Sequence, residues 1–335
     1  MNSTIEDVAA RAGVSTATVS RALRGLSNVS EQARTKVLKA AAELGYVVSP
    51  QAQALATGRT GSVALVLAGF DEWFGASVLE GAQRRLQSKG YSTVVHSLDY
   101  VRGKPQFDLD VAPLRRRVDG VMVISVPLTG PEIAVVESLD VPVVVVGNSN
   151  EPLASVSLDD VEVGILATQH LLELGHTVIG HITGALDEVS PFMPAGGRLE
   201  GWRQAMTQAG LDPDEELVEN SYFDISGGHD AMMELIDRRP DITAVFAAAD
   251  CIAVGVMQAL EERGLSVPGD VSVIGVDGEY PTALFPLTTI VQDPSLEGRI
   301  AADALIRMIA GGAVTGTQTV RGSLRPGHTT SIPRR

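Results

Sequence analysis

Residues 1–60 constrain the fold most strongly, because they combine short amphipathic helices with the residue types that begin and end helices. Thr4 is a typical N-cap, and Asp7 three residues later completes a capping-box pattern. Gly13 ends this first predicted helix, since glycine adopts the left-handed conformation at little cost. Ser15 can cap a second helix, which predicts a helix-turn-helix, a motif whose second helix lies in the DNA major groove. The outward face of the second helix is predicted to carry Thr16, Ala17, Ser20 and Arg21.

A third helix is predicted between Ser30, which caps it, and Gly45, which ends it. Three helices of this size can bury one compact core. The apolar stripe of the third helix is predicted to consist of Val37, Leu38, Ala41 and Leu44.

The segment that follows predicts one further, very short helix. Ser49 is its cap, Pro50 stands at the first helical position and Gly58 follows the last one. A helix of one or two turns is only marginally stable alone in water. It therefore needs a docking surface, either DNA or a second copy of itself.

The stretch from Thr4 to Thr60 resembles the DNA-binding head and hinge of the lac repressor/galactose repressor (LacI/GalR) family of bacterial transcription regulators. The matching text is TIEDVAARAGVSTATVSRAL, NVSEQARTKVLKAAAELGY and LATGRTGSVALVL. The resemblance continues to the C-terminus, more loosely between about Asp99 and Val118. It implies a sequence-specific DNA-binding regulator, in the first instance a repressor, that responds to a small effector such as a sugar or sugar derivative. An inducer would release DNA and a corepressor would tighten binding, and the sequence leaves both open.

Length and composition agree with a soluble regulator of several domains. The chain has 335 residues, of which 44% are hydrophobic, so two or three domains with substantial cores are expected. No stretch approaches the roughly 20 apolar residues of a membrane span. The N-terminus lacks a basic and apolar signal sequence, so a cytoplasmic location is expected. The one cysteine, Cys251, is expected to be a small buried residue rather than a reactive thiol.

The net charge of −15 is unevenly divided along the chain. Residues 1–60 carry a net charge of +3, whereas residues 61–335 carry −18. A mildly basic head thus precedes an acidic body, which phosphates should repel.

The body alternates apolar strands with amphipathic helices. Its first half is predicted to contain the strands Ser62–Ala68, Ser92–Leu98, Gly120–Ser125 and Val141–Gly147, with helices at Ser77–Lys89 and Pro131–Leu139. The pattern restarts at Asp160 with the helices Val161–Leu174, Arg198–Ala209 and Cys251–Arg263 and the strands Val178–Thr183, Ala244–Ala248 and Val271–Val276. Strands that are apolar on both faces and joined by helices indicate a parallel sheet covered on each side. Two doubly wound α/β units in tandem are therefore predicted.

The resemblance implies that these units are the two subdomains of a periplasmic-binding-protein type body. It also implies three chain crossings, near Leu158–Val163, Thr289–Gln292 and Thr319–Arg321. The predicted domains are a helix-turn-helix head at 1–47, a hinge helix and linker at 48–60, and an effector-binding and dimerisation domain at 61–335. Within that domain the N-subdomain is expected at about 61–160 plus 291–319, and the C-subdomain at about 161–290 plus 320–335.

Candidate effector-binding residues are expected beyond the carboxyl ends of the strands, where doubly wound sheets bind ligands. Trp73 and Phe74 are predicted in a loop after the first strand, where they could stack on a sugar or a purine or simply pack. Arg198 matches the family's ligand-binding arginine, and its planar fork suits hydroxyls and carboxylates; the alternative is a surface arginine at a helix start. The remaining candidates are Tyr222, at the family's aromatic position, Asp250 and Asp277.

The two aspartates have structural alternatives. Asp250 could equally be the N-cap of the following helix. Asp277 could accept two sugar hydroxyls or play a capping role. The chain departs from the family at two neighbouring positions, with Ala249 in place of a usual asparagine and Gly278 in place of a second aspartate. The ligand can therefore differ from a standard hexose.

The family match also assigns the DNA contacts. Thr16, Ala17 and Arg21 are expected to face base edges, where arginine can pair bidentately with guanine. In the hinge, Ala52 and Leu55 are expected in the minor groove, with Leu55 acting as a wedge that opens a base step; the alternative for Leu55 is packing against the body. Phosphate contacts, which fix register but not sequence, are expected from Ser15, Thr18, Asn28 and Ser30.

One head makes few contacts, so a homodimer on a pseudo-palindromic operator is expected. The chain has no heptad-bearing tail, which favours a dimer over a tetramer. No cofactor, metal or membrane partner is expected. A sugar-binding receptor without a role in gene regulation is the alternative, and it leaves the head unexplained. An enzyme is not expected, because the chain lacks a GxSxG elbow, a P-loop and a GxGxxG motif.

Overall fold

The computed structural model describes residues 3–23, 28–46, 58–67, 73–98, 109–126, 128, 130–149, 152–184, 193–279 and 286–334. These residues form two compact units, Met1–Gly61 and Ser62–Arg335, called here the head and the body. None of the helices in the described ranges has the length and apolarity needed to cross a bilayer.

The head contains three helices, α1 (Ile5–Ala12), α2 (Thr16–Leu23) and α3 (Glu31–Leu44). The predicted caps are confirmed. Thr4 and Asp7 form a capping box, with the Thr4 amide donating to Asp7 Oδ2 at 2.8 Å. Gly13 ends α1 in the left-handed conformation at a φ of 67°, which residues with a side chain rarely adopt. The head core is formed by Val8, Ala9, Ala12, Val19, Ala22, Val37, Ala40 and Ala41.

The predicted burial of one residue in the head is wrong. Leu38 is 50% exposed, because the buried face of α3 passes through Val37, Ala40 and Ala41 instead. A helix turns about 100° per residue, which places Ala40 and Ala41 about 60° and 40° to either side of Val37, and Leu38 about 100° away from it, outside the buried face.

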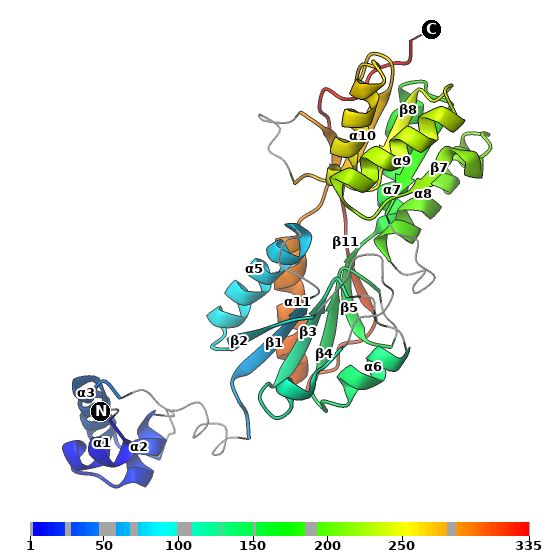
Figure 1. Ribbon diagram of the computed structural model, residues 1–335. Coiled ribbons are helices and arrows are strands. Elements are labelled where there is room, and N and C mark those ends of the chain that lie inside the picture. Colours follow the sequence, from blue (N-terminus) through cyan, green and yellow to red (C-terminus); the bar gives the residue numbers. More distant parts are fainter. Residues whose placement is uncertain are drawn as a thin grey trace. The chain divides into compact units, whose positions relative to one another are not determined.

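The body contains two six-stranded sheets (Figure 1). Sheet A has the strand order β11-β5-β4-β3-β1-β2, and its strands all pair in parallel. The strands are β1 (Ser62–Leu67), β2 (Ser92–Ser97), β3 (Gly120–Ile124), β4 (Val143–Val146), β5 (Ala154–Leu158) and β11 (Thr317–Val320). The helices of this subdomain are α5 (Trp73–Ser88), α6 (Gly130–Glu137) and α11 (Pro294–Ile309), with a 3-10 turn η1 (Ala112–Leu114).

Sheet B has the order β12-β10-β9-β8-β6-β7, and only β12 runs antiparallel to its neighbour. Its strands are β6 (Ile179–Thr183), β7 (Val218–Asn220), β8 (Ala244–Ala247), β9 (Ser272–Asp277), β10 (Thr288–Val291) and β12 (Ser323–Arg325). Its helices are α7 (Asp160–Glu173), α8 (Pro194–Gln208), α9 (Ile225–Arg238) and α10 (Asp250–Glu262), with a 3-10 turn η2 (Glu215–Leu217).

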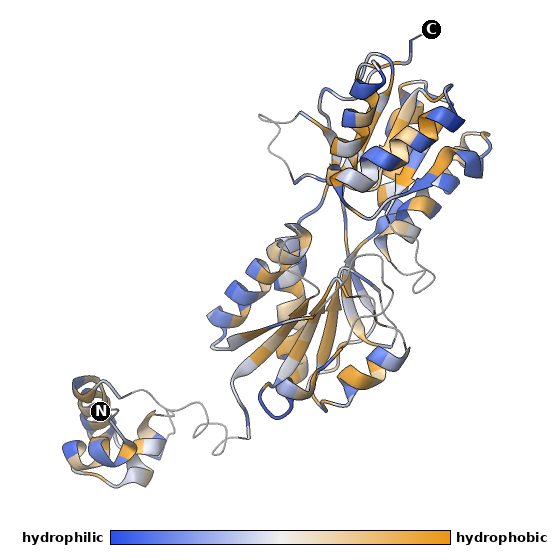
Figure 2. Cartoon of the chain, in the orientation of Figure 1, coloured by the Kyte–Doolittle hydropathy of each residue, from blue (hydrophilic) through white to orange (hydrophobic). Residues whose placement is uncertain are grey.

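The two sheets repeat one doubly wound pattern, as the sequence predicts. In each sheet the second strand lies outside the first and the third lies on its other side, so the order reverses between β1 and β3 and between β6 and β8. The chain changes subdomain between β5 and α7, between β10 and α11, and between β11 and β12. Figure 2 shows the apolar strands of both sheets covered by helices whose outer faces are hydrophilic. Such sheets bind ligands beyond their carboxyl edges, at the point where the order reverses.

Glycines let three helix pairs approach closely. Gly81 and Gly298 lie where α5 meets α11, Gly164 and Gly201 where α7 meets α8, and Gly228 and Gly255 where α9 meets α10. A Cβ at any of these positions would overlap backbone atoms of the partner helix; at Gly201 it would lie 2.8 Å from the Cα of Gly164. The glycines therefore set the distance between the helices that carry the charged residues described below.

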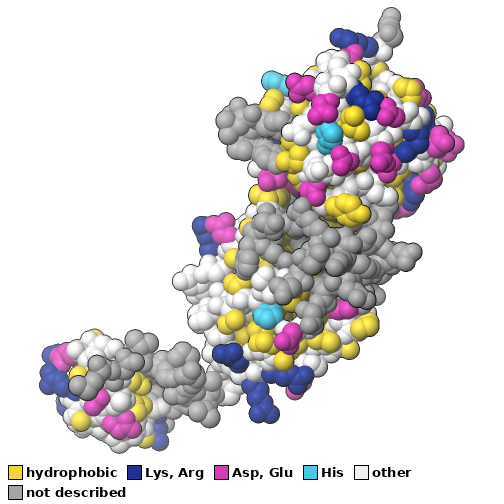
Figure 3. Space-filling view, viewed as in Figure 1, with side chains coloured by type: hydrophobic (Ala, Val, Ile, Leu, Met, Phe, Trp, Pro, Cys, Tyr) yellow, Lys and Arg dark blue, Asp and Glu magenta, His cyan; other side chains and the backbone are white. Residues whose placement is uncertain are grey.

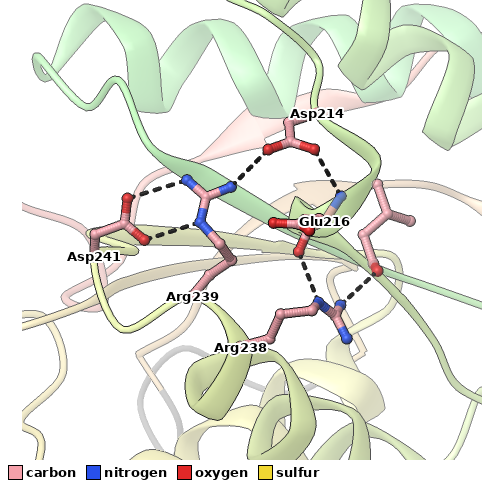
Figure 4. Close-up of polar contacts among 6 residues, drawn as sticks. Asp214, Glu216, Arg238, Arg239 and Asp241 are labelled. Carbon is pink, nitrogen blue, oxygen red and sulfur yellow. Dashed lines mark hydrogen bonds and ion pairs between the residues drawn. The ribbon is translucent and has the colours of Figure 1, made fainter.

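An ion-pair network holds the edge of sheet B (Figure 4). Arg239, at the end of α9, lies between Asp214 and Asp241, with nitrogen-to-oxygen distances of 2.9 and 3.0 Å. Arg238 donates to the carbonyl oxygens of Glu216 and Val218. These contacts fix η2 and β7 against α9, and β7 leads directly to the candidate aromatic residue Tyr222.

The glycine contacts give a stability prediction. Gly201→Ala should lower the free energy of unfolding by about 1–3 kcal/mol, because the added methyl group must push α7 and α8 apart. Gly130→Ala is the matched control, since nothing lies within 4 Å of its Cβ position. Urea denaturation measures both variants, and equal stability of the two would contradict the close-packing argument.

Candidate DNA interface and effector site

The outward face of α2 is free of core contacts. Thr16, Ala17 and Arg21 are exposed, whereas Val19 and Ala22 of the same helix are buried. An exposed face on the second helix of a helix-turn-helix is the surface that reads base edges. The three residues predicted to read bases are therefore presented together, and their contact with DNA stays a prediction.

The predicted phosphate-binding residues lie around this helix. Ser15 Oγ accepts from the Thr18 amide at 3.2 Å and lies 2.9 Å from the Thr18 hydroxyl, which confirms Ser15 as the cap of α2. Ser30 Oγ accepts from the Ala33 amide at 3.3 Å and so caps α3. Asn28 is exposed just before it. Both serines therefore have structural roles that DNA contacts would add to, while Ala52 and Leu55 lie outside the described residues.

At the carboxyl edge of sheet A, the aromatic pair lies at a helix start, not in a loop. Trp73 and Phe74 are the first residues of α5. Phe74 lies over the ends of β3 and β4, since a Cβ at Gly147 would come 2.9 Å from the Phe74 ring and 3.3 Å from Ser125 Oγ. The predicted loop is wrong because α5 begins four residues before the predicted helix start at Ser77. Phe74 thus packs at the edge where the strand order reverses.

At the carboxyl edge of sheet B, Phe223 lies against the sheet in place of the predicted Tyr222. Tyr222 is 56% exposed. Phe223, at a φ of 55°, turns its ring over the end of β6, where a Cβ at Gly184 would overlap it. Sequence reasoning missed Phe223, although it is adjacent to the predicted residue. A left-handed backbone at one residue redirects the chain, which the residue types alone do not reveal.

Arg198 is buried, not at the surface. It lies in the first turns of α8 and is 4% exposed. Its Nε donates to Asp160 Oδ1 at 2.9 Å, and its Nη1 donates to the Ala248 carbonyl oxygen at the end of β8 at 2.5 Å. Asp160 is the first residue of α7, and it was missed by the sequence analysis. The guanidinium therefore joins α8 to the chain crossing after β5 and to the strand end at the reversal point.

Asp250 is a fully buried cross-link. The predicted N-cap role is wrong, because Ala249 occupies the cap position and Asp250 begins α10. Its carboxylate accepts from the Gly278 and Glu279 amides at 2.9 and 3.1 Å and from the Thr289 hydroxyl at 2.6 Å. Burial, together with the charge of nearby Asp277, raises the pKa of Asp250 to about 7. These three donors favour a structural role that fixes the segment after β9.

Asp277 ends β9 in a conformation that favours glycine, with a φ of 124°. Its Oδ1 accepts from Gln292 Nε2 at 2.5 Å, and Gln292 stands in the crossing between β10 and α11. Burial raises the pKa of Asp277 to about 6, and the charge of Arg198 opposes this rise. Arg198 and Asp277, both predicted from the sequence, are thus brought close together.

Glu297 of α11 is the most unusual group that the sequence analysis missed. Its side chain is fully buried, and neither carboxylate oxygen has a hydrogen-bond partner among the described residues. Burial raises its pKa to about 8, with Asp160 raising it further and Arg198 lowering it. A signal was present, because Glu297 lies in phase with the buried face of α11, which contains Pro294, Gly298, Ala301, Ala302 and Leu305.

These residues form an acidic cluster, defined here as Asp160, Asp250, Asp277 and Glu297 around Arg198. Glu297 comes from the subdomain of sheet A and the other four from the subdomain of sheet B or the crossing into it. Burial raises the pKa of all four carboxyl groups, and the charge of Arg198 lowers the pKa of Asp160, Asp277 and Glu297. The arrangement can bind a small molecule that supplies hydrogen-bond donors or positive charge.

Two remaining observations concern the thiol of Cys251 and metal binding. Cys251 is partly buried and packs against the core of the sheet B subdomain, so it is less buried than predicted. Its Sγ donates to the Phe223 carbonyl oxygen at 3.2 Å, and burial raises its thiol pKa to about 12. A thiol with that pKa stays protonated and unreactive at neutral pH. Within the described ranges no three His, Cys, Asp or Glu side chains are arranged to hold a metal ion.

Comparison with known proteins identifies the family of the chain. Residues 4–49 match the family of bacterial regulatory proteins of the lacI type, and residues 168–330 match a periplasmic binding protein-like domain. The transcriptional regulator CelR of Thermobifida fusca is 36% identical over 323 residues, which covers 92% of either chain. The chain belongs to the LacI family. The ribose operon repressor of Escherichia coli strain K12 is 35% identical, covering 91% of this chain and 93% of that protein.

A solved structure extends this likeness to the whole fold. The lac repressor dimer bound to operator and the anti-inducer ONPF has a TM-score of 0.86 and 30% identity, covering 99% of this chain and 100% of that one. As a LacI-family protein, the chain combines a helix-turn-helix head with two parallel-sheet subdomains of the periplasmic-binding-protein type. Its relatives are transcriptional regulators, which fits the absence of enzyme motifs in the sequence.

The buried Glu297 gives a pH prediction. In the unfolded chain this group ionises near 4.5, whereas in the folded protein its pKa is about 8. Between these values the unfolded state releases a proton that the folded state keeps, so the free energy of unfolding falls as pH rises through that window. Each pKa unit corresponds to about 1.4 kcal/mol.

Glu297→Leu should remove this contribution. The variant should therefore be more stable than the wild type near pH 8 and closer to it near pH 5, as measured by urea denaturation at both values. Glu200→Leu, at an exposed position on α8, is the control and should leave the pH dependence unchanged. A variant whose stability difference from the wild type is the same at both pH values would contradict the raised pKa.

Proposed function

We propose that this protein is a transcriptional repressor that binds a pseudo-palindromic operator as a homodimer and changes its operator affinity when a small effector binds at the acidic cluster. The observation that carries the proposal is the exposed face of α2, with Thr16, Ala17 and Arg21 together on the second helix of a helix-turn-helix. The lac repressor, which has the same fold, is a dimer bound to operator in its solved structure.

Charge supports the orientation on DNA. Residues 1–60 have a net charge of +3 and residues 61–335 one of −18. Exposed acids stand on α9 and α10, among them Glu234, Asp237, Glu261 and Glu262. Figure 3 shows acidic side chains spread over the subdomain of sheet B. Phosphates repel such a surface and attract the head, so only the head can dock.

An exposed apolar edge supports the homodimer. β2 is the outer strand of sheet A, and Val94 and Val95 on it are 40% and 43% exposed. Among the described residues β2 has no partner strand on its outer side, and an apolar edge strand of this kind is a site for pairing with another chain. Two heads joined in this way would read two half-sites related by a twofold axis.

The hinge connects the two functions. We infer that the hinge, predicted between Ser49 and Gly58 and containing Ala52 and Leu55, forms a short helix that is stable only when two copies meet in the minor groove. An effector that changes the angle between the subdomains changes the distance between the two hinges. Linkage then requires that operator and effector alter each other's affinity by the same factor.

The effector proposal rests on where the candidate residues lie. Arg198 and Asp277 belong to the acidic cluster, and Phe74 and Phe223 lie at the carboxyl edges of sheets A and B. Trp73 and Tyr222 are nearby in the chain, whereas Asp250 already has three donors. Arg198 and Asp277 are therefore the proposed polar contacts, with the phenylalanines as apolar walls.

Arg21→Ala should relax base preference at one symmetric pair of operator positions, with a cost of about 1–3 kcal/mol for the lost bidentate contact. Selection of binding sites from a random DNA library measures this directly. Arg34→Ala, which removes an arginine of α3 from outside the proposed reading face, is the control and should keep the preference. An unchanged binding motif for Arg21→Ala would exclude it as a base reader.

The effector role of Arg198 is best tested in a form that leaves no buried unpaired charge. The double variant Arg198→Met with Asp160→Asn should lose the response to any sugar or nucleoside that a thermal-shift screen identifies, while operator affinity in gel-shift titrations persists. Arg203→Met, on the same helix but paired with Glu215 at the surface, should keep the response. An intact response in the double variant would move the effector site elsewhere.

A further inference from the structure

We propose that the effector of this protein carries a protonated amine, which the carboxylates of Glu297 and Asp160 bind in the acidic cluster. This inference rests on the proposed effector site and adds the chemical class of its ligand.

The primary observation is the state of Glu297. It is fully buried, and both of its oxygens lack hydrogen-bond partners within the described part of the chain. Folded proteins pair nearly all buried polar groups, so an unpaired carboxyl group calls for an explanation such as an absent ligand. Its position is rigid, because Gly298 next to it packs directly on the Val78 carbonyl of α5.

The second observation is that Arg198 is not a hydrogen-bond partner of Glu297. Its Nε is bonded to Asp160 and its Nη1 to the Ala248 carbonyl oxygen. The charged groups that act on Glu297 are Asp160 of α7, Arg198 of α8 and Asp293, the N-cap of α11, so two of the three are acidic. Asp277, bonded to Gln292, is a further carboxylate near Arg198.

An ammonium group matches this surplus of acceptors. It offers three donors and one positive charge, and an ionised carboxylate is an acceptor only. Binding of the amine would release the proton that burial keeps on Glu297 to the solvent and form a charge-assisted hydrogen bond in its place. A neutral hydroxyl brings one donor and no positive charge, so it cannot form the ion pair that an ammonium group forms with an ionised carboxylate.

The cation is organic and not a metal ion. A metal site needs several ligands converging on one point, and in the parts of the chain that the structure describes no three acidic, cysteine or histidine side chains converge in that way. An amine needs only two carboxylates at hydrogen-bond distance. Its carbon skeleton can then pack on the phenylalanines at the strand ends.

The test compares matched ligands on the full chain. Glucosamine, galactosamine and mannosamine are titrated by calorimetry beside the corresponding hexoses and N-acetylhexosamines, which keep the ring but lack the charge. We expect at least one hexosamine to bind about tenfold or more tightly than both neutral analogues. Equal or tighter binding of the neutral sugars, or no binding by any of the three amines, would overturn the inference.

Two variants assign the preference to the residue. Glu297→Gln keeps the side-chain shape and should abolish the preference for the amine, whereas Glu200→Gln, on the exposed face of α8, should retain it. The comparison with N-acetyl sugars needs no variant, so it decides the question even if Glu297→Gln fails to fold. A Glu297→Gln protein that still prefers the amine refutes the assignment.

Failure here and failure of the proposed function are distinguishable. If neutral hexoses bind and alter operator affinity in gel shifts, the regulatory proposal stands and the amine inference is wrong. If a hexosamine binds through Glu297 but leaves operator affinity unchanged, the ligand class stands and the regulatory coupling is wrong.

Discussion

The guanidinium of Arg198 is the contact on which the organisation of the body depends. It joins the start of α7, through Asp160, to the end of β8, through the Ala248 carbonyl oxygen. Its charge also lowers the pKa of Asp277 and Glu297 against the effect of burial. Loss of one partner from a buried ion pair is far more costly than loss of an exposed one, because the other charge stays buried. The cluster combines Glu297 of the sheet A subdomain with residues of the sheet B subdomain, so the proposed ligand would contact both.

Close helix packing makes this charge arrangement possible. Gly164 and Gly201 bring α7 and α8 into backbone contact, and Gly197 leaves space for Asp160, since a Cβ there would lie 2.6 Å from the Cβ of Asp160. On the other subdomain, Gly298 seats α11 on α5 and so fixes the adjacent Glu297. Protein interiors respond to small volume changes as packed solids do. The position of Glu297 is therefore tied to the packing of α11 on α5.

Many of the correct predictions rest on interactions between residues that are close together in the sequence. The caps Thr4, Ser15 and Ser30 and the terminating Gly13 act within a few residues, so the helices of the head could be placed from sequence. The doubly wound sheets follow from apolar runs joined by amphipathic segments. The errors arose at residues whose burial or role depends on contacts with distant parts of the chain. Leu38 is exposed because neighbouring helices select another face of α3, and Asp250 is no cap because amides after β9 bind its carboxylate.

The sequence by itself determined the family, the helix-turn-helix, the alternation of strands and helices, and the position of Asp277 at a strand end, because each depends on residue order over short spans. Only the tertiary structure decided that Asp160 pairs with Arg198, that Phe223 and not Tyr222 covers a strand end, and that Glu297 is buried without a hydrogen-bond partner among the described residues. Those facts depend on which segments meet after three crossings between subdomains. Desolvation and Coulomb interaction act through space, so residues far apart in the chain set the charge of this site.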